Sequence, residues 1–349
     1  MHDFLKIQSK IVPDLLVVMQ KRYQILRSIR LTEPVGRRTL AEMLGMTERT
    51  LRSEADFLKS QHLIVVKTAG MMVTNKGKKL LAELDKTMGE LTGIRQLEHE
   101  LKEILGISEV IIVPGDSDSA TFVKEELGKA CAERLSSSLS KDNVIAVTGG
   151  TTMTCTAEML TNHLGEKRNL LFVPARGGIG EDVRNQANVI CATMAENTGG
   201  SHRVLYVPDQ VGREVYESLL KEPVISEILQ LIKSSNIVLH GIGDAITMAG
   251  RRRSSESSMK KIIEEKAVAE AFGYYFNENG EIVHKVPTIG IQISDLHSGR
   301  QVIAAAGGKS KAKAIKAYMK SAPNSTILIT DEGAAKELLK GTFDSDATF

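Results

Sequence analysis

A short run of apolar residues, glycines and threonines near the middle of the chain is the segment best suited to bind a ligand. The β-prone residues Val144–Val147 precede Gly149 and Gly150, and Thr151 and Thr152 then open a helix-like segment. Glycines let the backbone come close to a ligand, and the first amides of a helix have no partners within the helix. The helix dipole favours an anion at the same place. The run therefore predicts a strand, a tight turn and a helix start that bind a phosphate.

Three further turns carry glycines or cations that could join this site. Arg176 directly follows a predicted strand, and a guanidinium group matches the geometry of a phosphate. The turn Gly307–Lys311 repeats the phosphate-loop pattern, with Lys311 as a point charge. The run Arg251–Arg253 follows a predicted helix over residues 244–250. A run of three arginines is usually a solvated face. A ligand with two phosphates, however, could be bound by these arginines together with the cations of the other two turns.

Enzymatic chemistry finds little support in the sequence. No His-Glu-x-x-His or Gly-x-Ser-x-Gly motif occurs, and no dinucleotide fingerprint or Walker A lysine pattern is present. Asp244 and Glu270 could act as general bases, but no nucleophile–base pair is evident, and we expect no catalytic residue. Glu270 fits an acceptor for a sugar hydroxyl as well as it fits a plain carboxylate on a helix surface. A sugar-phosphate isomerase or deaminase with a nucleic-acid-binding head stays the alternative.

The charge of the chain is unevenly distributed. The net charge is +2, but residues 1–92 alone carry +6 and residues 93–349 carry −4. A basic amino-terminal module on a mildly acidic body is typical of a DNA-binding head on a ligand-binding core. A chance fluctuation of surface charge is the other explanation that the asymmetry leaves open.

Length and composition predict a cytoplasmic protein of two or three domains. The 349 residues suffice for separate cores, and no apolar run approaches the ~20 residues that a membrane helix needs. The first residues lack the pattern of a secretory signal. Cys131, Cys155 and Cys191 are far apart and odd in number, which supports neither a disulfide framework nor a zinc site. We therefore expect no metal and no cofactor.

Residues 1–92 predict a winged helix-turn-helix with the start of a linker helix. An apolar stripe at helical spacing predicts a first helix between the first two prolines. Thr39 and Glu42 have the spacing of a capping box for a second helix, and Thr47 is placed to cap a third. Residues 63–73 then predict a strand, a glycine-containing turn and a strand, which is a wing.

The third predicted helix would read DNA. Leu51, Ala55 and Leu58 repeat at core spacing, so the residues between them should face outward and meet base edges in the major groove. Cations on the preceding helix and on the wing would neutralise phosphates. A winged helix used only for protein contacts is the alternative. The predicted DNA contacts are Arg37, Arg38, Arg49, Thr50, Arg52, Ser53 and Lys67.

Residues 93–349 predict the rest of the linker and a doubly wound, Rossmann-like α/β domain. An apolar stripe from Leu81 to Ile104 fits either a dimerising coiled coil or helices packed on their own domain. Beyond it, short apolar strands alternate with longer helical stretches, which indicates a parallel sheet covered by helices. Ligands bind such sheets beyond the carboxyl ends of the strands. Strands are predicted over 110–113, 144–147, 170–173, 204–207, 237–240, 289–293, 302–306 and 326–330, and helices over 121–139, 152–164, 224–233 and 311–320.

The chain resembles the SorC-type bacterial transcription regulators over nearly its whole length. The similarity is densest in Leu31–Arg38, Val147–Thr152, Phe172–Gly178 and Ala271–Phe276, and it continues through Thr330–Lys336. The resemblance implies a non-catalytic effector domain with the fold of sugar-phosphate isomerases. It also implies a repressor of a glycolytic operon that responds to fructose 1,6-bisphosphate and that forms dimers, with tetramers on DNA.

The resemblance also implies which residues contact the effector. Two positions depart from the pattern of the family, since Gly250 stands where a larger polar residue is expected and Lys309 where serine is usual. Lys309 adds positive charge close to the site. The implied effector contacts are Gly149, Gly150, Thr151, Thr152, Arg176, Gln186, Arg251, Arg252, Glu270 and Lys311.

Overall fold

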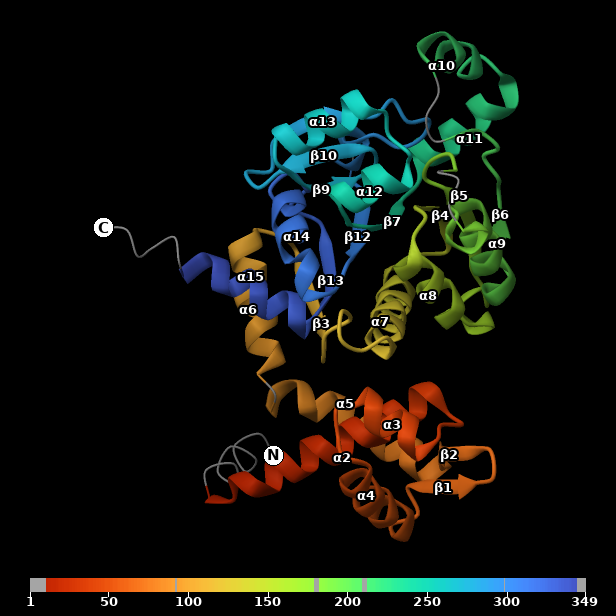
Figure 1. Ribbon diagram of the computed structural model, residues 1–349. Helices are drawn as coiled ribbons and strands as arrows, with labels where there is room; N and C mark the ends of the chain where they lie inside the picture. Colours follow the sequence, from red (N-terminus) through yellow and green to blue (C-terminus); the bar gives the residue numbers. More distant parts are fainter. Residues whose placement is uncertain (1–10, 92, 179–181, 209–211, 298, 344–349) are drawn as a thin grey trace. The chain divides into compact units, whose positions relative to one another are not determined.

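The computed structural model describes residues 11–91, 93–178, 182–208, 212–297 and 299–343. It divides into two compact units, Met1–Gln96 and Leu97–Phe349 (Figure 1). The sequence places the boundary four residues earlier, after residue 92. None of the helices in the described part of the chain is long and apolar enough to cross a membrane.

The amino-terminal unit consists of helices around a two-stranded hairpin. The strands pair antiparallel, and the second strand begins directly after the turn, at Gly70, whose φ is +135°. A continuous apolar core joins the helices to the hairpin, and Leu26, Leu40 and Leu51 are among its fully buried members. The elements are α2 (Pro13–Thr32), α3 (Arg37–Met43), α4 (Glu48–Ser60), β1 (Ile64–Lys67), β2 (Gly70–Val73) and α5 (Asn75–Leu91).

The two predicted helix caps have different outcomes. Thr47 caps α4 as predicted, since its side chain accepts a hydrogen bond from the Thr50 amide. The capping box at Thr39 is wrong, because α3 already begins at Arg37 and its N-cap is Gly36, which provides no side-chain bond. The adjoining residue Val35 exchanges backbone hydrogen bonds with Met71 of the hairpin, and this fixes where the helix can start.

The predicted linker is two helices, α5 and α6 (Ile94–Leu105), with Gly93 between them at φ +72°. Leu81 on α5 is buried in the core of the amino-terminal unit, and Leu84 packs against the same core. On α6, Leu101 is fully buried whereas Ile104 is 46% exposed. The first half of the apolar stripe therefore packs on its own domain. The side chains of Met88 and Leu91 lie outside the described part.

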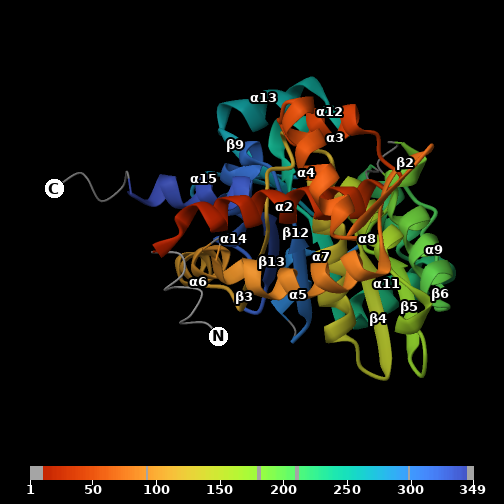
Figure 2. The same ribbon diagram turned by 90° about the horizontal axis from the view of Figure 1, so that it is seen from below.

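The second unit is built on a seven-stranded parallel sheet with the strand order β3-β13-β12-β7-β4-β5-β6. Figure 2 shows β4, β5 and β6 side by side, with α9 beyond them. The strands are β3 (Glu109–Val113), β4 (Asp142–Val147), β5 (Asn169–Pro174), β6 (Ser201–His202), β7 (Ile237–Gly241), β12 (Gln301–Ala305) and β13 (Ile327–Asp331). The helices beside them are α7 (Phe122–Ser138), α8 (Thr151–Met159), α9 (Ala187–Thr198), α10 (Arg213–Leu219), α11 (Pro223–Ser234), α14 (Ala312–Met319) and α15 (Glu332–Phe343).

Two predicted strands of this unit are wrong. The sheet edge is Ser201–His202, and residues 204–207 leave it because the Asn188 side chain bonds both the amide and the carbonyl of Leu205. Residues 289–293 form only one antiparallel bridge, between Gly290 and Arg176, before a 3-10 turn over Ile293–His297. In both segments the backbone groups are satisfied outside a ladder, so an apolar, β-prone composition does not produce a strand.

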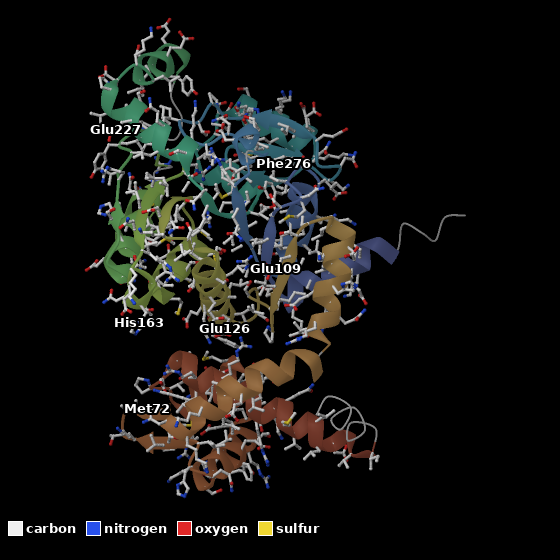
Figure 3. All side chains as sticks on the ribbon, turned by 180° about the vertical axis from the view of Figure 1, so that it is seen from behind. Met72, Glu109, Glu126, His163, Glu227 and Phe276 are labelled. Carbon is white, nitrogen blue, oxygen red and sulfur yellow. The ribbon has the colours of Figure 1, made fainter. Side chains whose placement is uncertain are left out.

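A four-stranded antiparallel sheet, which the sequence did not predict, lies beside the parallel one. Its order is β11-β10-β9-β8, and α14 packs against β9 and β10. Phe276 lies on β10 and is fully buried (Figure 3). Its ring meets the ring of Tyr318 of α14 edge to face. The elements are β8 (Gly243–Asp244), β9 (Ala267–Ala271), β10 (Tyr274–Asn277), β11 (Ile282–Lys285), α12 (Ala245–Arg251) and α13 (Glu256–Glu264).

Candidate anion-binding site and nucleic-acid interface

A cavity lies at the carboxyl ends of the parallel strands β4, β5, β7 and β12, as the sequence predicts for a doubly wound sheet. The antiparallel sheet supplies a further wall through Glu270 and Phe272. Nine of the ten predicted effector contacts line this cavity, namely Gly149, Gly150, Thr151, Thr152, Arg176, Gln186, Arg251, Glu270 and Lys311. Segments that are far apart in the sequence therefore meet in one place.

The amino end of α8 forms one side of the cavity. Gly150 is its N-cap at φ +121°, a conformation that residues with a side chain rarely adopt, and it provides no capping side chain. A Cβ atom on Gly149 would lie 2.6 Å from the Asn185 carbonyl oxygen, so glycine is needed there for close packing. The turn therefore brings the start of a nine-residue helix, with the hydroxyls of Thr151 and Thr152, to the cavity. Such a helix start favours an anion.

Three cationic side chains reach the cavity from different elements. Arg176 follows β5 and is 6% exposed, Arg251 ends α12, and Lys311 precedes α14. Burial lowers the pKa of Lys311, and the neighbouring charges of Arg251 and Lys124 lower it further. Positive charges crowd together here in a partly desolvated place. An anionic ligand would relieve this repulsion, which is the electrostatic signature of an anion site.

Arg252 is the one predicted effector contact that does not line the cavity. Its side chain is 1% exposed and donates to Glu270 Oε1 at 2.7 Å and to the Tyr275 hydroxyl at 3.0 Å. The helix turns by about 100° per residue, so consecutive arginines at its end point in different directions. Arg251 lines the cavity, whereas Arg252 does not line it and contacts Glu270, which does.

Glu270 is a buried acceptor and not a helix-surface carboxylate. It lies on β9 and its Oε1 atom accepts from Arg252, from the Gly273 amide at 2.7 Å and from Arg176 at 3.3 Å. Burial raises the pKa of Glu270, but the charges of Arg252 and Arg176 with these hydrogen bonds outweigh it, so the pKa lies below its usual range. The group is therefore a carboxylate and can accept a hydrogen bond from a hydroxyl group.

The turn Gly307–Lys311 is not a second phosphate loop. Its amides already donate to carboxylates: Gly308 to Asp331 at 2.7 Å, Lys309 to Asp116 at 3.3 Å and Ser310 to Asp118 at 2.7 Å. Acidic side chains thus occupy the places that a phosphate would take in such a loop. Only Lys311 of this turn lines the cavity, so the turn contributes its ammonium group and not its amides.

Other groups have roles that the sequence did not reveal. Asp244 caps α12, because its carboxylate accepts from the amide and the hydroxyl of Thr247 at 2.8 and 2.7 Å. Phe272 lines the cavity with a positive φ of 56° and packs against the ring of His240. The dipeptide Phe272-Gly273 between two β-prone runs is the signal of a tight turn that could have located this residue.

In the amino-terminal unit, α4 presents a polar face opposite its buried residues. Leu51, Ala55 and Leu58 are buried as predicted. Most of the predicted DNA contacts are exposed, including Arg38 and Lys67, and Arg37 is half-buried. Arg38 pairs with Glu42 on its own helix. The predicted contacts that lie on the exposed face of α4 are Arg49, Thr50, Arg52 and Ser53.

A partly buried ion pair, which sequence reasoning missed, ties α4 to α2. Glu54 accepts from Arg22 at 2.8 Å and contacts Lys21 at 2.5 Å, and the guanidinium of Arg22 lies over the ring of Phe57. Burial raises the pKa of Glu54, but these two cations outweigh it and lower the pKa overall. The pair fixes α4 on α2 and thereby sets which face of α4 is exposed.

Comparison with known proteins agrees with this two-part design. The CggR N-terminal DNA binding domain family matches residues 18–88, and a family of sugar-binding domains matches residues 89–340. The Central glycolytic genes regulator of Priestia megaterium is 55% identical over 341 residues, covering 97% of this chain and 99% of the relative. The Bacillus subtilis protein of that name is 52% identical over 340 residues, with the same coverage of both chains.

Solved structures share the fold. A SorC family transcriptional regulator from Enterococcus faecalis has a TM-score of 0.67 and 51% identity over 70% of this chain and 99% of that chain. The full-length sorbitol operon regulator SorC from Klebsiella pneumoniae has a TM-score of 0.65 over 93% of this chain and 99% of that chain, at 17% identity. The second likeness concerns the fold alone.

A DNA-binding unit joined to a sugar-binding α/β unit defines a transcriptional regulator. The chain belongs to the SorC family of transcriptional regulators and, within it, to the group of central glycolytic genes regulators. Its relatives are named as regulators and not as enzymes, so the isomerase or deaminase alternative is not supported.

Proposed function

We propose that the chain is a repressor of a glycolytic operon whose hold on its operator is modulated by fructose 1,6-bisphosphate. Its amino-terminal unit acts as a winged helix-turn-helix, with α4 in the major groove and the β1–β2 hairpin as the wing. Arg49 and Arg52 are placed to read base edges, while Arg37, Arg38 and Lys67 neutralise phosphates.

The observation that carries the proposal is the distribution of polar groups around the cavity. The amino end of α8 offers amides and two hydroxyls, while Arg176, Arg251 and Lys311 add three cations from separate elements. A ligand with one phosphate would leave part of this positive charge without a counter-charge. A bisphosphate would neutralise it with two groups, and the Glu270 carboxylate would accept a hydrogen bond from a hydroxyl of the sugar between them.

The names of the relatives support the target genes. Two proteins that are more than half identical to this chain over nearly its whole length are named as regulators of central glycolytic genes. An intermediate of glycolysis is a suitable signal for such genes, because its level reports the flux that they control. We further propose that the regulator acts as a homodimer, which would match a two-fold symmetric operator, and as a tetramer on DNA.

Fluorescence anisotropy of labelled DNA from upstream of the glycolytic genes tests the proposal. The titration is done at fixed salt, with and without fructose 1,6-bisphosphate, and fructose 6-phosphate is the control because it lacks the second phosphate. We expect the bisphosphate alone to weaken or reorganise the complex. DNA binding that responds to neither sugar would refute the effector, and absent or salt-independent DNA binding would refute the role of the head.

A further inference from the structure

The side chain of Arg252 is buried but does not line the cavity, so Arg252 is neither a surface arginine nor a residue of the cavity wall. Its guanidinium group donates to the Tyr275 hydroxyl at 3.0 Å and to Glu270 Oε1 at 2.7 Å. Tyr275 itself is fully buried in the small core of the antiparallel sheet. The arginine is therefore held on a rigid support, and it contacts Glu270 without lining the cavity itself.

Glu270 is shared between two arginines with different surroundings. Arg252 Nη2 lies 2.7 Å from Oε1 and Arg176 Nη1 lies 3.3 Å from the same atom, and only Arg176 lines the cavity. The three groups together carry one net positive charge. Without Arg252, the carboxylate would keep its hydrogen bonds from Arg176 and the Gly273 amide but lose the shorter of its two arginine contacts.

The second oxygen of Glu270 lies toward the cavity wall at Gly243. A Cβ atom on Gly243 would lie 3.5 Å from Oε2 and 2.4 Å from the Met248 side chain, and both Gly243 and Met248 line the cavity. Three donors on Oε1 fix the rotation of the carboxylate and so fix where Oε2 points. A fixed acceptor costs a ligand less ordering entropy than a mobile one.

We propose that Arg252 is a positioning residue of the effector site: it fixes the Glu270 carboxylate toward the sugar hydroxyls. The inference rests on the proposed function, because it assigns the discrimination for hydroxyl groups to the same cavity. Arg252 acts through Glu270 and does not touch the ligand.

The test measures the affinity of two ligands by isothermal titration calorimetry on the full chain. Fructose 1,6-bisphosphate carries hydroxyls, and hexane-1,6-diol bisphosphate carries the same two phosphates without them. In Arg252→Met we expect the affinity for the sugar to fall at least tenfold. We also expect the preference for the sugar over the diol to fall at least fivefold. Arg252→Lys keeps the charge but cannot reproduce the hydrogen bonds that the guanidinium group donates to Glu270 and Tyr275 together, so the preference for the sugar falls in this variant as well.

A double-mutant cycle separates positioning from general damage to the fold. Since Arg252 acts through Glu270, Arg252→Met should add less than a twofold loss of sugar affinity in a chain that already carries Glu270→Gln. Arg300→Lys is the control, because Arg300 is also buried but bonds the carbonyl groups of Ile232 and Lys233 far from the cavity residues. It should leave the preference unchanged.

The possible outcomes are distinguishable. A folded Arg252→Lys protein that keeps the wild-type preference for the sugar overturns the inference. An equal loss of affinity for both ligands in Arg252→Met overturns it as well. Fully additive effects with Glu270→Gln overturn it too. Failure of the wild-type protein to bind fructose 1,6-bisphosphate refutes the proposed function instead, and the inference with it.

Discussion

At the scale of single residues, Lys311 is the cavity cation whose contribution is easiest to isolate. Its ammonium group is mostly buried, and burial and the charge of Arg251 lower its pKa, so a bound phosphate would offset both costs. Lys311→Met should weaken fructose 1,6-bisphosphate binding by about 10- to 100-fold, the range for one charge-assisted contact. DNA binding without effector should not change. Calorimetry measures the first effect and anisotropy the second.

Lys309 provides the matched control for this variant. It lies in the same turn, is 58% exposed and pairs with Glu337 at 3.7 Å, and it does not line the cavity. Lys309→Met should therefore change effector affinity by less than about twofold, as expected for an exposed charge. An equal loss in both lysine variants would mean that general electrostatic attraction, and not a specific contact at Lys311, determines the affinity.

His240 gives the protein a predictable sensitivity to acid. The residue is fully buried, bonds the Gly241 carbonyl and the Tyr318 hydroxyl, and burial lowers its pKa to about 4. Below pH 6.5 the unfolded chain takes up a proton that the folded chain refuses, so stability falls as the pH drops from 6.5 towards 4. The free energy of unfolding that this group removes is about 2 kcal/mol at pH 5.

The variant His240→Gln tests this pH dependence. Glutamine can keep polar contacts at this position without titrating, so the loss of stability between pH 7 and pH 5 should be about 2 kcal/mol smaller than in the wild type. Urea unfolding at the two pH values measures the difference. His163→Gln is the control, because the side chain of His163, labelled in Figure 3, lies at the surface and is 87% exposed by area. A His240→Gln protein with the wild-type pH dependence would contradict the assignment.

How much of the site the sequence could predict depends on what each residue's role requires. Gly149 and Thr152 follow from a local pattern, because a helix start is encoded by neighbouring residues. Arg251 and Arg252 are the same residue type at consecutive positions, so only the fold decides which of them lines the cavity. The burial of Glu270 depends on a sheet whose strands the sequence did not reveal.

At the scale of elements, α4 carries the prediction for DNA recognition. Its buried face and the ion pair of Glu54 fix the orientation of the helix, and this orientation leaves Arg49 and Arg52 exposed. Arg49→Ala and Arg52→Ala should each weaken specific DNA binding by about 1–3 kcal/mol and leave effector binding intact. Lys59→Ala, in the last turn of the same helix, should cost less. Anisotropy with specific and scrambled DNA separates base readout from phosphate contact.

A weaker salt dependence distinguishes the two roles further. Loss of a phosphate contact lowers the slope of log affinity against log salt by about 1, and it affects all sequences equally. Loss of a base contact instead lowers the preference for the specific site. If Arg49→Ala and Arg52→Ala both weaken scrambled and specific DNA alike, the exposed face of α4 does not read bases.

Elements were predictable where local pattern and tertiary contacts agree. The parallel strands β4, β5 and β7 are short apolar runs followed by turns, and their burial on both faces explains why the pattern is strong. The apolar run 204–207 failed as a strand because the Asn188 side chain, 17 residues away from Leu205, takes over its backbone hydrogen bonds. No property of the run itself encodes that partner.

At the scale of the whole molecule, the division into two units makes the two binding activities separable. Each unit has its own apolar core, and the predicted DNA contacts and the cavity residues lie in different units. Any effect of the effector on DNA binding must therefore be a coupling free energy between two sites. Tight effector binding alone would not produce it, because a ligand shifts an equilibrium only by its different affinity for the two states.

Thermodynamic linkage turns this coupling into the strictest prediction for the regulator. If fructose 1,6-bisphosphate lowers the affinity for operator DNA by a given factor, operator DNA must lower the affinity for the bisphosphate by the same factor. Calorimetric titration of the effector into free protein and into the saturated protein–DNA complex measures the second factor, and anisotropy measures the first. Lys311→Met should weaken effector binding in both states by a similar factor, leaving the coupling itself close to the wild-type value. The two factors could differ at one protein concentration and become equal at another. This result would show that the effector acts by changing the assembly of subunits on DNA, because only then does the coupling depend on a subunit association step.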